Sequence, residues 1–385
     1  MRFAVFAALI IAPGATLAGQ ERDSTRADSV RSAPAESGPK LDFSGVVFAN
    51  YQYRTDAASR DANKFDVERA YLTFRVPAGN RASVRLTADV YQAPAGSDAF
   101  YRGWALRAKY AYLQYNYLDG SSWKGLARIG LIQTVFVEQD EQFWPRWISN
   151  TATERAGYFS SADAGLATSV SLPRKFGELY AGITNGPGYT SREIDRFKDF
   201  SGRLTLTPWS AASASPFRSV ALSLWGYKGA LASRFASGGD GQVGPVGDAL
   251  ERDRWGVHVG ATSPRLIFGV QYASRTDAGE SGANTAVSPR VDIDSTGTLR
   301  SAYAIARPVA LAAGIPSHPL GILARWDRVE TNTVTGDEYD FVVAGIIWDL
   351  SSKVSAALDY QEASPVKGRP VPVSKVWFVH FTARF

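Results

Sequence analysis

Apolar and polar residues alternate along most of the chain from Leu41 onward, in runs of about ten residues separated by turns or loops. The last run, VWFVHFTARF, shows the pattern most clearly. One of its parities is apolar and aromatic and consists of Trp377, Val379, Phe381, Ala383 and Phe385. Because alternate side chains of a strand point to opposite faces, this run predicts a strand with one apolar face. Taken alone, it fits the closing strand of a membrane barrel and the last strand of a soluble sheet equally well.

The connections between the runs favour the barrel, because short and long connections alternate. The short ones are residues 75–83, 119–124, 173–177, 263–265 and 350–353, and the long ones are 54–63, 93–104, 134–163, 185–196, 229–251 and 276–298. Short periplasmic turns and longer external loops are typical of transmembrane β-barrels, and a soluble sandwich has no reason to keep this order. We therefore predict an all-β fold, a transmembrane antiparallel barrel of about 16 strands. The predicted strands centre near residues 47, 70, 87, 112, 129, 168, 181, 203, 224, 258, 270, 304, 325, 344, 358 and 380.

The inward face predicted from the parity is polar. In the third run Val84 and Leu86 fall on the lipid side, and Arg85 and Thr87 fall on the inner side. Small polar residues and charges on the inner face predict a water-filled lumen with little apolar surface. The runs near residues 304 and 344 are apolar on both parities, so the pattern does not orient them.

The start of the chain predicts export. Residues 1–18 combine Arg2, an apolar run and small residues, which indicates a signal peptide. Residues 19–40 are polar and aperiodic and are predicted to form a flexible periplasmic leader, so the barrel is expected at residues 41–385. No later stretch is long and apolar enough for a spanning helix, which leaves strands as the membrane-crossing element. These features predict that the protein lies in the outer membrane of a Gram-negative bacterium.

The composition adds few candidates for chemistry. The chain has no cysteine and three histidines, and it contains neither H-E-x-x-H nor G-x-S-x-G. The glycine pattern GDGQVG at residues 239–244 lies in a predicted loop with no helix after it, and we interpret it as a loop tip. We predict no catalytic residues, no enzyme activity, no metal, no cofactor and no nucleic-acid partner. The formal charge of +5 gains meaning only once it is placed on a face.

Arginines dominate the charges that the parity places on the inner wall. The predicted pore-lining and anion-binding residues are Arg69, Arg85, Arg128, Arg203, Arg254 and Arg325 on the strands, with Arg146 and Arg155 from a loop. A guanidinium is permanently charged and suits carboxylate or phosphate, and rings of basic side chains are a common filter of anion pores. The alternative is that these arginines pair with loop acids and have a structural role.

The longest connection, residues 134–163, is predicted to fold into the barrel as a constriction. It contains bulky apolar residues that a freely solvated loop does not favour. Its predicted constriction residues are Glu138, Asp140, Glu141, Trp144 and Trp147. Because the loop is net acidic, it opposes a simple anion preference of the wall.

Several segments in order resemble one family. They are FDVERAYLTF (65–74), KYAYLQY (109–115), RIGLIQTVFVEQDE (128–141), TERAGYFSSADAG (153–165), GELYAGITNGPGY (177–189) and LARWDRVE (323–330). Together they are similar to the phosphate-selective porin O and P family, over most of residues 43–385. The resemblance implies a sixteen-stranded porin, usually trimeric, with an inward-folded third loop.

The sequence therefore predicts an outer-membrane porin, a passive diffusion channel for small anionic solutes such as phosphate. Its expected partners are outer-membrane lipid, the solute and two further copies in a homotrimer. Phe385 is predicted to close the barrel at the lipid interface. A general or sugar-type porin without anion selectivity is one alternative. A non-conducting barrel, such as an adhesin, an anchor or a membrane enzyme, is the other.

Overall fold

A computed structural model describes residues 41–92, 103–193, 195–210, 219–232, 249–281, 291–368 and 371–385. The predicted signal peptide and leader, residues 1–18 and 19–40, lie outside the described residues, as do several loop segments. Among the described residues no helix is long and apolar enough to cross a bilayer.

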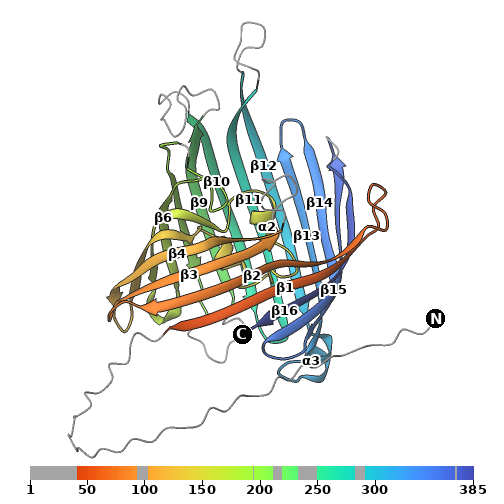
Figure 1. Ribbon diagram of the computed structural model, residues 1–385, viewed down its shortest axis with the longest axis horizontal. Helices are drawn as coiled ribbons and strands as arrows, with labels where there is room; N and C mark the ends of the chain where they lie inside the picture. The colour runs from red at the N-terminus through yellow and green to blue at the C-terminus, as the bar shows by residue number, and fades with distance from the viewer. Residues whose placement is uncertain are drawn as a thin grey trace, which may run out of the picture. The chain divides into compact units, whose positions relative to one another are not determined.

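Sixteen antiparallel strands form one closed barrel (Figure 1). The strands are β1 (Asp42–Arg54), β2 (Asn63–Pro77), β3 (Ala82–Gln92), β4 (Trp104–Asp119), β5 (Lys124–Gln133), β6 (Ala162–Ser171), β7 (Gly177–Thr184), β8 (Asp199–Leu206), β9 (Ala221–Ala232), β10 (Ala249–Thr262), β11 (Leu266–Ser281), β12 (Val291–Ala306), β13 (Leu320–Asn332), β14 (Asp337–Asp349), β15 (Val354–Lys367) and β16 (Ser374–Arg384). Each strand pairs with its neighbours in sequence, and β16 returns to pair with β1. The predicted fold is confirmed, and every predicted strand centre lies within a strand.

The seam between β1 and β16 holds the C-terminus in the sheet. Val46 faces Arg384 in the register, and the Phe385 amide and carbonyl bond to the carbonyl and amide of Gly45 at 3.0 and 2.8 Å. The Phe385 ring covers Gly45 so closely that a Cβ there would lie 2.2 Å from the ring. Phe43 lies on the same outer face, 6.0 Å from the Phe385 ring. The last residue therefore completes the seam with both its backbone and its side chain.

The outer face of the barrel carries a belt of exposed apolar side chains. Along β3, Val84 and Leu86 are 43% and 46% exposed, while Thr87 and Asp89 on the other parity are buried. Other members of the belt are Leu106, Leu113, Ile129, Leu166, Leu179, Leu204, Leu222, Leu224, Trp255, Val270, Ile322, Ile346, Leu358 and Phe381. A belt of this extent would be costly in water, whereas lipid matches it, and a closed barrel leaves no unpaired edge in the bilayer. The protein is an outer-membrane barrel.

The connections differ from the prediction at three places. The link between β13 and β14 is short, residues 333–336, which departs from the predicted alternation of short and long connections. The periplasmic link between β12 and β13 carries helix α3 (Pro308–Ala313), which the pattern of alternation did not predict. Strands β9 to β12 also extend further into the external connections than predicted, to Ala232 and Ala249 on one side and to Ser281 and Val291 on the other. Polar alternating residues continue a ladder beyond the lipid belt, where the apolar signal has ended.

The third external loop, residues 134–161 between β5 and β6, folds into the barrel. It contains two short helices, α1 (Val137–Asp140) and α2 (Ala152–Arg155), the second of which is drawn within the ring of strands in Figure 1. Trp144 and Trp147 are 1% and 4% exposed. Their rings contact inward side chains of the wall, Tyr303 at 5.5 Å and His380 at 6.2 Å. The predicted inward position of this loop is confirmed.

The inner face is not polar throughout, which corrects the expectation of a lumen with little apolar surface. The inward residues of β12 to β14 include Leu299, Ile305, Leu323, Phe341, Val343 and Ile347, all buried. They pack with apolar residues of the third loop, such as Trp144 and Ile148. Two of these strands, β12 and β14, are the runs near residues 304 and 344 that the pattern could not orient, because their outer face meets lipid and their inner face meets the loop.

Candidate functional site

Side chains of the wall hold the third loop by its backbone carbonyls. The donors and their acceptor carbonyls are Arg203 to Val135, Arg254 to Tyr158, Arg275 to Ala156, Arg325 to Asn150 and Gln361 to Ile148; Tyr180 donates to the carbonyl of Gln133, the last residue of β5 before the loop. The donor–acceptor distance is 2.7 Å from Arg325, 2.9 Å from Gln361 and 3.1 Å from Arg275. Buried carbonyls need such donors, and a loop inside a barrel has few other ways to satisfy them.

The same arginines are also neutralised by acids of the wall. Arg325 pairs with Asp327 at 2.5 Å, and both side chains are 1% exposed. Arg254 pairs with Asp277 at 2.8 Å, and Arg203 pairs with Glu178. Three of the predicted pore-lining residues, Arg203, Arg254 and Arg325, are therefore largely buried and bonded to the loop, and Arg203 and Arg254 also border smaller cavities of about 350 and 330 Å³. The alternative stated from the sequence paired the arginines with acids of the loop; in the structure the acidic partners of these three lie on the wall strands, and the loop supplies backbone carbonyls.

Most of the other predicted arginines have partners as well. Arg69 pairs with Asp89 at 3.1 Å, a carboxylate that Arg107 also reaches. Arg146 bonds to Glu141 and Glu154, both at 2.6 Å.

Arg128 and Arg155 have weaker or apolar partners. The Arg128 guanidinium donates to Gln114 and Gln133 and lies 3.8 Å from Glu138. The Arg155 guanidinium lies over the Phe341 ring, 3.4 Å from its centroid, on the apolar wall. Of the predicted arginines, only Arg85 has neither an acidic partner among the described residues nor a place against the apolar wall.

The predicted loop acids separate into two groups. Asp140 is fully buried and accepts hydrogen bonds from Gln271 and Tyr303 of the wall at 3.4 and 3.3 Å. Burial raises the pKa of this loop carboxyl to about 7. Glu138 and Glu141 instead line a cavity, as does Trp147. Trp144 is packed against the wall on the other side of the loop.

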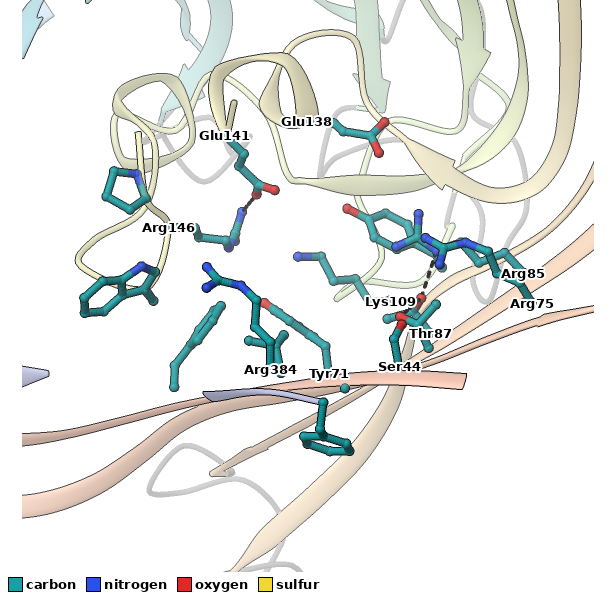
Figure 2. A pocket seen from close by; sticks show the side chains of 18 residues that line it. Ser44, Tyr71, Arg75, Arg85, Thr87, Lys109, Glu138, Glu141, Arg146 and Arg384 are labelled. Atoms are coloured by element: carbon teal, nitrogen blue, oxygen red, sulfur yellow. Dashed lines mark hydrogen bonds and ion pairs between the residues drawn. The ribbon is translucent and has the colours of Figure 1, made fainter. Parts of the chain in front are cut away.

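This cavity, of about 440 Å³, lies between the third loop and the wall formed by β1 to β4 and the end of β16 (Figure 2). Its charged lining among the described residues is Arg75, Arg85, Lys109, Arg146, Arg384, Glu138 and Glu141. Five cations thus face two carboxylates, and Arg146 already binds Glu141. The apolar part of the lining includes Phe48, Tyr71, Tyr110, Pro145 and Trp147. We call this space the basic cavity.

Three cations of the basic cavity have no acidic partner among the described residues. The Lys109 side chain is 3% exposed and makes no hydrogen bond or ion pair with them; its ammonium points into the cavity in Figure 2. Its Nζ lies 4.2 Å from the Tyr71 ring centroid. Arg85 stacks over Tyr110 at 4.5 Å and donates to the Thr87 hydroxyl at 3.1 Å. Arg384, the last residue of β16, is exposed and lines the cavity.

A β-bulge brings Lys109 to the inner face. In the ladder between β3 and β4, Thr87 faces Tyr110 and Ala88 faces Ala108, so Lys109 is the extra residue. Lys109 and Tyr110 are consequently both buried on the inside. Bulges re-aim side chains in this way and are frequent near functional sites. A signal exists in the sequence, because the lipid-facing apolar residues change parity between Leu106 and Leu113.

Comparisons with known proteins find solved structures with a similar fold but no protein with a similar sequence. No family model matches the chain, and no curated protein matches it in sequence. Among solved structures, the outer membrane channel DcaP of Acinetobacter baumannii has a TM-score of 0.61 at 14% identity, covering 91% of this chain and 99% of that chain. An anion-selective porin from Comamonas acidovorans has a TM-score of 0.57 at 11% identity, covering 90% of this chain and 100% of that chain. OmpT of Vibrio cholerae, in its trimer form, has a TM-score of 0.57 at 12% identity, covering 90% of this chain and 99% of that chain. These likenesses show the barrel fold, and the resemblance to the phosphate-selective porin O and P family stays a prediction.

Proposed function

We propose that the protein is a porin that passes small anionic solutes, phosphate among them, by passive diffusion across the outer membrane. The observation that carries the proposal is the cluster of unpaired cations, Arg85, Lys109 and Arg384, facing the third loop across the basic cavity. The buried wall arginines Arg203, Arg254 and Arg325 have acids beside them, whereas these three cations can bind a solute. The role is transport, with no enzyme activity.

The charges suit conduction because the cations border a cavity rather than a closed core. Two unit charges 4 Å apart interact by about 1 kcal/mol in bulk water and by about 4 kcal/mol at the effective dielectric of a protein surface. A preference of several-fold for anions follows, without trapping the ion. Salt should weaken the preference, because the Debye length shrinks from about 10 Å at 0.1 M to about 3 Å at 1 M.

A homotrimer is part of the same proposal. The outer belt of apolar side chains can face lipid or a neighbouring barrel, and closed rings of identical subunits are common among oligomers. The structural neighbour OmpT of Vibrio cholerae is described in a trimer form, which supports the proposal by analogy. Crosslinking and native mass measurement of the protein in mild detergent test it.

The test of the function is the reversal potential of the protein in a planar bilayer across a tenfold KCl gradient. We expect single-channel conductance and a potential of the sign that chloride permeation gives. A folded barrel without conductance would point to the non-conducting alternatives. A conducting barrel with cation preference would mean that Glu138 and Glu141 govern the permeation path.

A further inference from the structure

We infer that the basic cavity binds organic anions that combine one carboxylate with an apolar ring, such as aromatic carboxylates, and that it favours them over inorganic phosphate. The inference rests on the proposed porin function and names the solute class that its constriction selects. Two features of the cavity carry it: an unpaired buried ammonium on one side and a wall of aromatic rings on the other.

Lys109 supplies the first feature. A lysine that is 3% exposed normally has a carboxylate or several acceptors beside it, because an unpaired buried charge is costly. Lys109 has none among the described residues and rests only on the faces of Tyr71 and Tyr110, at 4.2 and 5.4 Å. A bulge in β4 places it there. An anion in the cavity would provide the acceptor that the ammonium lacks, and Arg85 and Arg384 lie on either side of it in Figure 2.

Aromatic rings supply the second feature. Phe48 and Tyr71 pack edge to face at 5.7 Å and line the cavity together with Trp147 from the third loop. The Tyr71 hydroxyl is buried and has no hydrogen-bond partner among the described residues. A ring placed against Phe48 and Trp147 would bury apolar surface. A carboxylate on that ring could accept from Lys109.

Inorganic phosphate uses only half of this lining. It has no apolar surface, so it would leave the aromatic wall in contact with water. A cavity of about 440 Å³ lies in the range of roughly 300–1,000 Å³ of pockets for organic ligands, which are mostly apolar with a few polar groups. An aromatic carboxylate matches both the volume and the division of the lining into a basic and an apolar side.

The experiment measures inhibition of single-channel chloride current by benzoate, acetate and inorganic phosphate at pH 6, which favours the charged form of a buried lysine. Acetate carries the same carboxylate without the ring. We expect benzoate to halve the current at a concentration roughly tenfold or more below that of acetate and of phosphate, as burial of a ring implies. In Lys109→Met the benzoate concentration that halves the current should rise roughly tenfold or more, which is the expected effect of losing one charge-assisted hydrogen bond.

The matched control is Lys375→Met. Lys375 also lies on a strand, but it pairs with Glu362 at 3.4 Å and does not line the cavity. The Lys375→Met substitution removes the same charge as Lys109→Met and should leave benzoate inhibition unchanged. If Lys109→Met fails to give the heat-modifiable band of a folded barrel, Arg85→Met replaces it with the same expectation.

The outcomes separate this inference from the proposed function. A conducting protein that benzoate, acetate and phosphate inhibit equally would overturn the inference and leave the porin in place. Equal loss of benzoate inhibition in Lys109→Met and Lys375→Met would overturn it as well, since the effect would then be one of net charge. If the wild type does not conduct, the porin proposal fails, and calorimetric titration of benzoate into the detergent-solubilised protein still decides whether the cavity binds it.

Discussion

The two sides of the barrel use the same residue type for different purposes. On the side of β10 to β14, inward arginines such as Arg254 and Arg325 are buried, paired with acids and bonded to carbonyls of the third loop. On the side of β1 to β4, Arg85 and Lys109 face a cavity without acidic partners among the described residues. The third loop makes the difference, because it packs closely against the first side and leaves a cavity along the second.

This comparison shows that an inward charge is not by itself a pore charge. A buried pair such as Arg325 and Asp327 gains little net stability, but it becomes costly when one partner is removed. A cation on the open side costs less to replace and instead acts on ions that pass. Stability measurements and selectivity measurements should therefore separate the two sides.

The largest expected effect is that of a substitution in the seam between β1 and β16, which completes the side of the barrel formed by β1 to β4. Phe385→Asp places a charge where the ring covers Gly45 and faces lipid. We expect little folded, heat-modifiable protein in the outer membrane, because a charge on the lipid face is unfavourable and the ring contacts of the seam are lost. Phe385→Leu, which keeps an apolar group, is the control and should insert much better. Normal surface levels of folded Phe385→Asp would show that the side chain has no part in closure.

The next effect tests the buried side directly. Arg325→Met leaves Asp327 buried without its cation and removes the donor to the Asn150 carbonyl, and we expect a loss of about 3–5 kcal/mol in the free energy of unfolding. Arg85→Met removes only a cation that stacks on Tyr110, worth about 1 kcal/mol or less. Urea unfolding of both variants in lipid vesicles measures the difference. Equal losses would remove the distinction between the two sides.

Removal of the centre of the third loop should convert the closed side into an open one. Replacement of residues 143–150 by a short Gly-Ser linker deletes the stretch that contains Trp144 and Trp147. Because this stretch fills the barrel interior against β12 to β16, we expect a single-channel conductance several-fold above that of the wild type. Shortening the link at residues 333–336 is the control, since it lies outside the interior. An unchanged conductance in a folded protein would place the loop away from the current path.

The smallest effect is on selectivity. In a tenfold KCl gradient, Arg85→Ala should reduce the anion preference most, because Arg85 has no acidic partner among the described residues. Arg128→Ala should have less effect, since Glu138 lies 3.8 Å away, and Arg155→Ala should have the least, since its guanidinium lies against Phe341. The reduction in anion preference that each substitution causes should be smaller at 1 M salt. The reverse order, with Arg155 dominant, would mean that the loop and not the open side sets the filter.

The candidate site was predictable in part. The parity rule placed Arg85 correctly on the inner face, and bulky residues in residues 134–163 indicated a loop inside the barrel. The same rule could not tell Arg85 from Arg325, because both alternate identically with apolar neighbours. It also missed Lys109, since a bulge shifts the parity in the middle of β4. Asp327 lies two residues from Arg325 on the same face of β13, but the Asn150 carbonyl comes from a distant part of the chain, and only the folded loop brings it to the wall.

The sequence by itself determined the barrel. Period-two alternation with lipid on one face is a local property of each strand, and a membrane barrel must repeat it in every strand because lipid cannot satisfy an open backbone. Only the tertiary structure decided which part of the inner surface borders the cavity and which part the third loop covers. The apolar inner faces of β12 to β14 and the arginines beside them acquire their role from the loop that covers them, and that contact joins residues far apart in the chain. Burial of a charge depends on everything packed around it, so the alternation of single residues could place these charges inside the barrel but could not assign their function.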